Sequence, residues 1–312
     1  MKKIVVIFLF LFVVIPNKFI AQTTFAFLRL DESPRAAALA GSFVANNDDP
    51  NVIFYNPAGI NYLKSRPISF SFVKHVLDIN SASIAYSQKI KNLSGRFSAG
   101  IQYINYGSFQ GADPFGTKTG KFGAGELAAT IGYGNELDKN FYYGVNIKFI
   151  FSSIEKRSSI AFATDLGLHY SIPEQRWNFG FSILNLGSQL TQYYSTKESL
   201  PLDVRIGFSK TLAHVPFTFF ASLNKLNESY KNLSDRLKQF TVGGEFKMSK
   251  VIKLRFGYDN EKRKELKVGN TAGLAGFNVG VGIFVKNYNI DYAFSSMGSI
   301  GALHRIGIST VF

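Results

Sequence analysis

From residue 67 to the end of the chain, apolar and polar side chains alternate with a period of two. Residues 141–152 show the pattern most clearly, because aromatic and aliphatic residues occupy every second position. Successive side chains of a β-strand point to opposite faces, so this period indicates strands with one apolar face each. It predicts about fourteen strands, at 68–74, 81–88, 95–106, 124–133, 141–152, 160–171, 177–183, 202–209, 217–224, 240–247, 252–259, 277–286, 288–295 and 303–312.

The apolar faces of these segments carry no Asp, Glu, Lys or Arg. A Lys or Arg on the lipid face of a membrane barrel costs about 2–4 kcal/mol at the bilayer midplane, so lipid would enforce such faces. The opposite faces are rich in Gly and polar residues, and aromatic residues stand near the strand ends, as in interfacial girdles. A soluble β-sandwich would alternate too, but its core needs neither girdles nor glycine-rich polar faces. We therefore predict an all-β, transmembrane antiparallel β-barrel.

The connections between these segments alternate in length, which supports the same architecture. Membrane barrels of bacteria have short turns on the periplasmic side and longer loops outside. An even number of strands then leaves both chain ends in the periplasm. The short connections are 91–94, 134–139, 173–176, 213–216, 248–250 and residue 287, and most of the others are longer: 107–123, 186–200, 227–238 and 260–273.

The start of the chain has the features of a secretory signal peptide. Met1-Lys2-Lys3 is followed by an apolar run from residue 4 to residue 15, which is too short for a membrane span. We expect residues 1–21 to be removed, residues 22–66 to form a plug-like segment and residues 67–312 to form the barrel. The chain has no Cys, which excludes disulfides and thiol chemistry.

Residues 22–66 lack the period-two pattern. Ser33 and Pro34 predict the start of a short helix, and Gly41 predicts its end. The motif Asn56-Pro57-Ala58-Gly59 follows further along the chain. Its chemistry alone predicts a turn, which leaves two alternatives: a simple exposed turn or a segment packed inside the barrel.

Three stretches here resemble the N-terminal segment of the PorV/PorQ family: 35–41 (Arg-Ala-Ala-Ala-Leu-Ala-Gly), 48–50 (Asp-Asp-Pro) and 55–59 (Tyr-Asn-Pro-Ala-Gly). Residues 295–298 and 301–305 are similar to the C-terminal part of the PorQ branch. The resemblance implies an outer-membrane barrel related to the FadL fatty-acid channels, with the Asn-Pro-Ala segment as a hatch in the lumen.

The resemblance also implies a function. PorQ-like proteins belong to the type IX secretion system, where this chain would anchor the surface complex that processes and attaches secreted cargo. Its expected neighbours are PorV and the PorU-like and PorZ-like proteins. The terminal Phe312 resembles the signal that directs barrels to the outer membrane.

The remaining residues give little sign of catalysis. Asp165 and His169 share one strand face, but four residues along a strand separate them by roughly 13 Å. No nucleophile–base spacing, metal-ligand spacing or nucleotide loop is evident, so we expect no catalytic residues, no metal and no cofactor. An alternative function, a FadL-like channel for hydrophobic small molecules, would need an apolar pocket beside the hatch and a lateral opening. The mostly polar inward faces argue against that alternative.

The long loops are basic. On an outer leaflet they would meet anionic lipopolysaccharide or an acidic partner, although a merely solvated loop face would have the same composition. Nucleic acid is excluded as a partner of an exported barrel. The candidate partner-facing residues are Lys231, Arg236, Lys262, Arg263 and Lys264.

Overall fold

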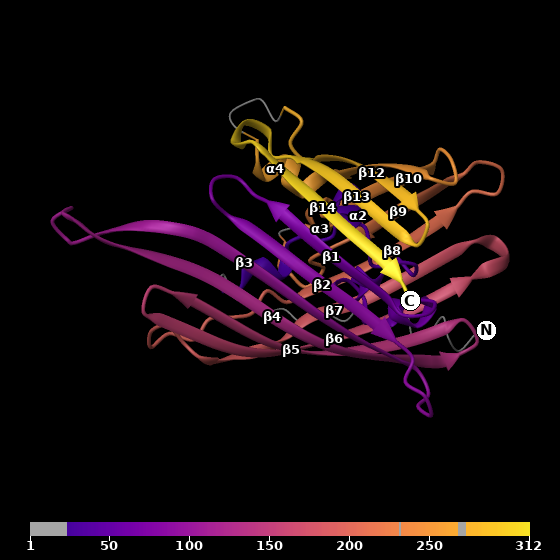
Figure 1. The fold of residues 1–312 in the computed structure, drawn as a ribbon, viewed down its shortest axis with the longest axis horizontal. Helices are drawn as coiled ribbons and strands as arrows, with labels where there is room; N and C mark the ends of the chain where they lie inside the picture. The colour runs from indigo at the N-terminus through magenta and orange to yellow at the C-terminus, as the bar shows by residue number, and fades with distance from the viewer. Residues whose placement is uncertain (1–23, 231, 268–272) are drawn as a thin grey trace.

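In the computed structural model, which describes residues 24–230, 232–267 and 273–312, fourteen antiparallel strands form a closed barrel (Figure 1). Each strand pairs with its neighbour in sequence, and β1 pairs with β14 to close the ring. The prediction of an all-β antiparallel barrel is therefore confirmed. The strands are β1 (Pro67–Lys74), β2 (Asn80–Gln88), β3 (Arg96–Ala112), β4 (Lys118–Asp138), β5 (Phe141–Ile154), β6 (Arg157–Ile172), β7 (Trp177–Thr191), β8 (Asp203–Thr211), β9 (Phe217–Leu223), β10 (Phe240–Lys247), β11 (Ile252–Asp259), β12 (Phe277–Val285), β13 (Tyr288–Ser296) and β14 (Ala302–Val311).

The helical elements are short. Of those in the described residues, four precede β1, and the others lie in connections between strands. Within the described part of the chain, none is long and apolar enough to cross a membrane. The helical elements are η1 (Ala26–Arg29), α2 (Pro34–Ala38), η2 (Pro50–Phe54), η3 (Pro57–Tyr62), η4 (Pro173–Gln175), α3 (Leu233–Leu237), α4 (Asn260–Glu265) and η5 (Gly298–Ile300).

The apolar faces of the strands point outward. Phe149 and Phe179, on β5 and β7, are each 37% exposed, whereas Ile150 and Ser182, on the inward faces of the same two strands, are fully buried. Val281 of β12 is half-buried on the same outer surface. These three side chains of the strands thus do not meet in a common interior, which is the arrangement of a membrane barrel rather than of a soluble sandwich.

The first and last strands close the barrel in continuous register, from Pro67 opposite Val311 to Lys74 opposite His304. The backbones of Arg66 and Phe312 exchange two further hydrogen bonds, of 3.1 and 3.3 Å. The backbone of the terminal residue is therefore bonded to the sheet, while the residue as a whole is 75% exposed. Its role as an insertion signal stays a prediction.

The third and fourth strands are longer than predicted. Residues 107–123, expected to be a loop, continue them as a two-stranded ribbon that projects beyond the neighbouring strands (Figure 1). Phe109 pairs with Phe122 there, with ring centroids 5.5 Å apart. A register shift between Asn105 and Ser108 interrupts the period-two pattern, and glycines hide what remains of it. The period-two pattern therefore placed the ends of these two strands too close to the barrel.

Two other expected loops also contain regular structure. β7 runs to Thr191, beyond the predicted end at residue 183. A register shift in its pairing with β6 breaks the alternation, which is why the sequence pattern did not reveal the rest of the strand. The stretches 227–238 and 260–273 contain α3 and α4, respectively.

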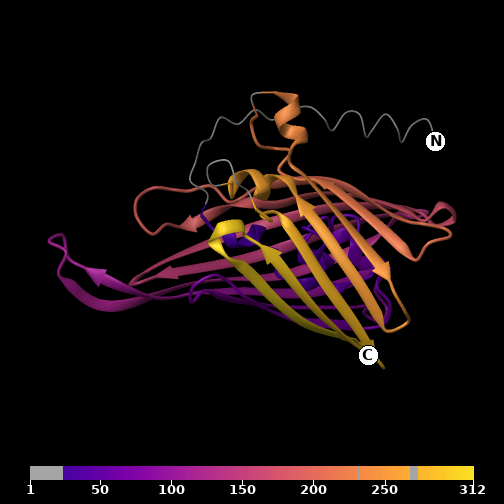
Figure 2. The ribbon, with the colours of Figure 1, turned by 90° about the horizontal axis from the view of Figure 1, so that it is seen from above.

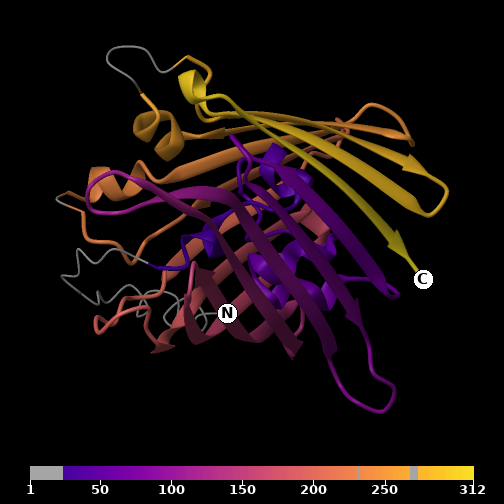
Figure 3. The same cartoon turned by 60° about the vertical axis from the view of Figure 1, so that its left-hand side comes forward.

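The N-terminal segment, residues 24–66, lies within the ring of strands (Figures 2 and 3). Its helix α2 contacts β11 to β14, while η2 and η3 contact β1 to β6. The signal peptide predicted at residues 1–21 lies outside the described residues.

A charged residue introduced on the outer wall tests whether the apolar faces of the strands contact lipid. We expect Ile147→Lys, on a side chain that is 62% exposed, to lower the free energy of unfolding by about 2–4 kcal/mol in lipid vesicles. Ser153→Lys, nearer the end of the same strand β5, should cost about 0–1 kcal/mol. Urea titration of the refolded barrel in vesicles measures both. Equal, small effects would contradict a lipid-facing wall.

Candidate functional site: the N-terminal segment inside the barrel

Three capped turns shape the N-terminal segment. Ser33 accepts a hydrogen bond from the Ala36 amide at the start of α2, as predicted, and Gly41 follows with a φ of +72°. Asp49 and Asn56 cap η2 and η3 in the same way, each followed by a proline. A capping side chain followed by Pro satisfies an orphan amide and presets the first helical residue. Local sequence thus fixes the shape of the segment.

The Asn56-Pro57-Ala58-Gly59 motif is packed against the wall rather than exposed. Asn56 is fully buried, and its Nδ2 donates to the carbonyls of Val44 at 2.8 Å and Leu168 at 3.0 Å. Its Oδ1 accepts from the Ala58 amide at 3.0 Å. The amide side chain therefore joins two turns of the segment to strand β6.

Glycines of the wall make room for this motif. A Cβ at Gly144 or Gly167, on β5 and β6, would collide with the backbone of Pro57 and Ala58 or with the Asn56 side chain. A Cβ at Gly59 would come within 2.6 Å of the Asn46 carbonyl oxygen. The glycines of the polar strand faces are thus sites of close backbone approach.

A buried network of charges joins the segment to β10 and β11. Arg35, which is 5% exposed, donates from Nε to Glu245 at 2.9 Å and from Nη1 to Asp48 at 2.8 Å. Glu245 also accepts from Arg255 at 2.8 Å and pairs with Lys253 at 3.3 Å. Burial would lower the pKa of Arg35, but Asp48 and Glu245 raise it above its ordinary value. The guanidinium is therefore permanently charged and anchored.

A second network joins the segment to α4 and β14. Lys262 Nζ lies 3.3 Å from Asp31, and Arg305 donates to the Asp31 carbonyl at 2.7 Å. Tyr55 donates to the Asp31 carboxylate at 3.1 Å. Burial alone would raise the pKa of Asp31, but Lys262, Arg305 and Arg205 together hold it below its usual value. This carboxylate is a fixed anion within a ring of cations.

Glu32, Ser81 and His75 form a polar chain that the sequence did not suggest. Ser81 Oγ donates to Glu32 at 2.7 Å and lies 2.8 Å from His75 Nε2. Burial raises the pKa of Glu32 to about 7, although Ser81 and Arg305 lower it. Burial lowers the pKa of His75 to about 4, with help from Arg305 and Lys74. In a catalytic triad the acid contacts the imidazole, whereas the Glu32 carboxyl contacts the serine. These three side chains are therefore not arranged as a catalytic triad.

An apolar cluster fills the inner side of the wall near the projecting ribbon. Phe25, Phe27 and Leu28 of the N-terminal segment are at most 7% exposed there. The inward faces are therefore less uniformly polar than the sequence indicated. The wall side of this cluster consists of Ile104, Ala128, Ile150, Ala161, Ala163 and Leu200.

Asp165 and His169, which share a strand face, have separate partners. Asp165 pairs with Lys148 at 2.9 Å and accepts from Asn146 at 2.8 Å. The imidazole of His169 packs against the ring of Tyr62, with centroids 4.7 Å apart. Asp165 is therefore engaged within the wall, whereas His169 contacts the N-terminal segment.

The candidate partner-facing residues lie in different surroundings. Lys262 is engaged by Asp31 and Asp259, both at 3.3 Å. Arg263 donates to the Gly273 carbonyl at 3.0 Å, and Arg236 in α3 is half-buried. Lys264 is exposed, whereas Lys231 lies outside the described residues. Their role toward partners stays a prediction.

The fold is similar to that of solved channel structures. No protein-family model and no curated protein matches the sequence. The chain is similar to the Pseudomonas putida toluene transporter TodX (12% identity, TM-score 0.57, covering 90% of this chain and 98% of that one). A Pseudomonas aeruginosa FadL homologue is similar at 10% identity and a TM-score of 0.57, covering 90% of this chain and 98% of that one. The monoaromatic hydrocarbon channel CymD is similar at 10% identity and a TM-score of 0.57, covering 90% of this chain and 97% of that one. The fold is thus similar to that of these three structures.

The charge network around Glu245 should be necessary for stability. Glu245→Gln leaves buried cations without their shared anion, so we expect a loss of about 3–5 kcal/mol in the free energy of unfolding. Asp48→Asn is the matched control, because it removes the other partner of Arg35 but its side chain is 57% exposed; we expect a loss of about 0–1 kcal/mol. Urea unfolding in detergent measures both, and equal losses would contradict a buried network.

Glu32 should make stability depend on pH. Because its pKa is raised from about 4.5 in the unfolded chain to about 7, the folded state binds the proton more tightly. Stability from this group is therefore lost as pH rises from about 4.5 to 7, by roughly 3 kcal/mol in total.

We expect Glu32→Gln to match the wild type near pH 4.5 and to be more stable at pH 8, as measured by heat-induced unfolding followed by gel mobility. Ser81→Ala retains the titrating carboxyl and removes a hydrogen bond that lowers its pKa, so it should keep a stability loss with rising pH that is at least as large. Parallel curves for Glu32→Gln and the wild type would contradict the assignment. Because His75 titrates with the opposite slope over an overlapping range, the difference between variants is the informative quantity.

Proposed function

We propose that this chain is an outer-membrane scaffold of the type IX secretion system, which anchors the surface complex that processes and attaches secreted cargo. The observation that carries the proposal is the fastening of the N-terminal segment by buried ion pairs, through Arg35 on one side and Asp31 on another. A segment held by such ion pairs supports a barrel that presents a fixed surface over one that conducts. Its role is then to bind partners.

The sequence resemblance supplies the particular system. The stretches that resemble the PorV/PorQ family, at 35–41, 48–50 and 55–59, are the ones that make the capped turns and wall contacts described above. A FadL-like fold agrees with the relationship between these families and the FadL channels. The comparisons do not bear on the secretion system itself, which rests on the motifs.

The proposal includes a place and an orientation. After removal of residues 1–21, the barrel would lie in the outer membrane with both chain ends in the periplasm. The ribbon of residues 107–123 and the helices α3 and α4 would then face outward, toward PorV, PorU-like and PorZ-like partners and lipopolysaccharide. The basic residues Arg236 and Lys264 would contribute to that surface.

A second function is a channel for hydrophobic small molecules. The comparisons support it more directly than the scaffold, because the similar structures are a toluene transporter, a FadL homologue and a monoaromatic hydrocarbon channel. The apolar cluster around Phe25 and Phe27 is the specific observation in its favour. A hydrophobic molecule could bind there only if the N-terminal segment moved.

One deletion experiment separates the two functions. In a strain that lacks this chain, the scaffold predicts that secreted cargo is no longer attached to the cell surface, while uptake of radiolabelled toluene is unchanged. Affinity purification of the tagged chain in mild detergent should recover secretion-system proteins, and a variant with residues 108–122 replaced by a short turn should recover fewer. A variant shortened in 192–200 is the control. Loss of uptake with intact surface attachment would favour the channel.

A further inference from the structure

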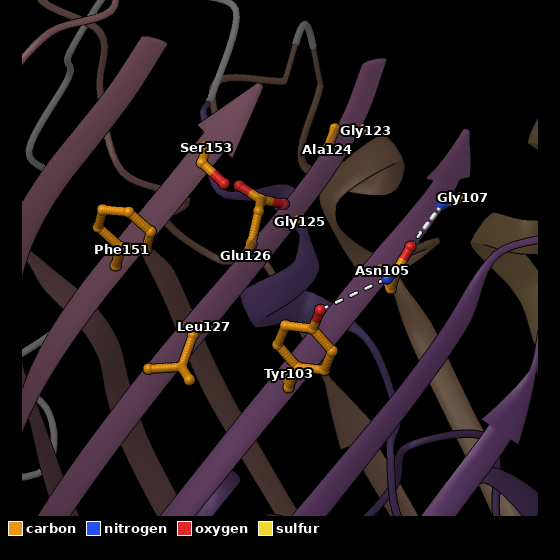
Figure 4. Close-up of a pocket in the computed structure, with 10 residues that line it drawn as sticks. All are labelled: Tyr103, Asn105, Gly107, Gly123, Ala124, Gly125, Glu126, Leu127, Phe151 and Ser153. Carbon is orange, nitrogen blue, oxygen red and sulfur yellow. Dashed lines mark hydrogen bonds between the residues drawn. The ribbon is translucent and has the colours of Figure 1, made fainter. Parts of the chain in front are cut away.

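A groove runs along the outer wall where the ribbon leaves the barrel. Its volume is about 400 Å³, and it crosses β3, β4 and β5. Figure 4 shows its lining, with Tyr103, Leu127 and Phe151 side by side. These residues occupy one row of the sheet, because Tyr103 pairs with Leu127 and Leu127 pairs with Phe151. The lower part of the groove is therefore apolar.

The next row of the sheet toward the ribbon is polar instead of apolar. It consists of Asn105, Gly125 and Ser153, which pair across the same three strands. Asn105 is held in place, since its side chain accepts from the Gly107 amide at 2.7 Å. On the outer face of a membrane barrel, a change from aromatic to polar rows marks the edge of the apolar band. The groove therefore crosses the membrane–water interface.

A second hollow of about 640 Å³ continues the groove toward the ribbon. The two hollows share Gly123 in their linings. Lys121 and Lys156 line the second hollow together with Glu155, and all three are exposed. Within the described part of the chain, neither ammonium group has a carboxylate within 4.0 Å. The second hollow thus carries a net charge of +1 next to an apolar groove.

Small residues keep this path open. A Cβ at Gly123 would meet only the Gly107 carbonyl oxygen, at an ordinary distance of 3.5 Å. The backbone therefore does not require glycine at this position, and a larger side chain would occupy the space between the hollows. The nearby Glu126 carboxylate is buried and accepts a hydrogen bond from Tyr106, so it is already engaged.

We propose that this path binds an acylated, phosphorylated lipid of the outer leaflet. An acyl chain lies against Tyr103, Leu127 and Phe151, and the phosphate lies beside Lys121 and Lys156. The apolar part faces the hydrocarbon and the cationic part faces water, so the site matches the polarity of such a lipid along its length. Lysine ammonium groups bind phosphate as point charges. This site goes beyond the scaffold role, because it takes a lipid rather than a protein, although Lys121 of its cationic part lies on the ribbon of residues 107–123.

The test uses the full-length barrel in detergent with fluorescently labelled lipid A, which carries phosphates and acyl chains, and measures anisotropy. We expect the wild type to bind it at least tenfold more tightly than it binds a labelled acylated glycolipid without phosphate. The double variant Lys121→Gln/Lys156→Gln should lose most of that preference. Gly123→Leu should weaken binding of both lipids about tenfold.

Matched control variants make the same kinds of substitution at positions away from the two hollows. Lys91→Gln/Lys250→Gln removes two exposed lysines from the turns at the opposite end of the barrel, and Ala221→Leu adds bulk to the outer face of β9. Both should bind like the wild type. Equal binding by all variants, or no preference for phosphate, would overturn the proposal. Surface attachment of cargo is scored separately, so failure of the lipid site and failure of the scaffold remain distinguishable.

Discussion

The pairing of β1 with β14 is the constraint on which the rest of this structure depends. A strand edge that faces lipid leaves backbone amides and carbonyls without partners, and each such group costs several kcal/mol. Closing the sheet removes that edge and separates an inner from an outer surface. The apolar side chains can then face outward, as Phe149 and Phe179 do, while the polar faces line the interior. The usual distribution of a soluble protein is thereby reversed.

A polar interior creates a second requirement, which the N-terminal segment meets. Buried charges are tolerated only when they are paired and hydrogen-bonded. Arg35 pairs with Glu245 of the wall, and Asp31 pairs with Lys262 of the helix α4. Small residues on both sides bring the backbones close, as at Gly144 against Pro57. Segment and wall are therefore complementary in charge and in shape.

The segment is not held equally everywhere, and this difference connects the two candidate functions. Its middle is fastened by ion pairs, whereas Phe25 and Phe27 are held by apolar packing, with Arg29 nearby contacting Leu202 and Glu228. A scaffold needs only the fastened part. A channel for hydrophobic molecules would need the apolar part to give way to a ligand of similar chemistry.

The sequence by itself determined the class of the fold, because strand alternation, helix caps and turns are local properties. The even strand count, the outward apolar faces and the cap at Ser33 could all be predicted. The ribbon of residues 107–123 could not, since a register shift and glycines conceal the alternation there. Only the tertiary structure decided the candidate site. Arg35 and Glu245 are 210 positions apart, and Ser81 meets Glu32 across 49 positions. No local pattern encodes such pairs, because which inward residues meet depends on closure of the whole ring.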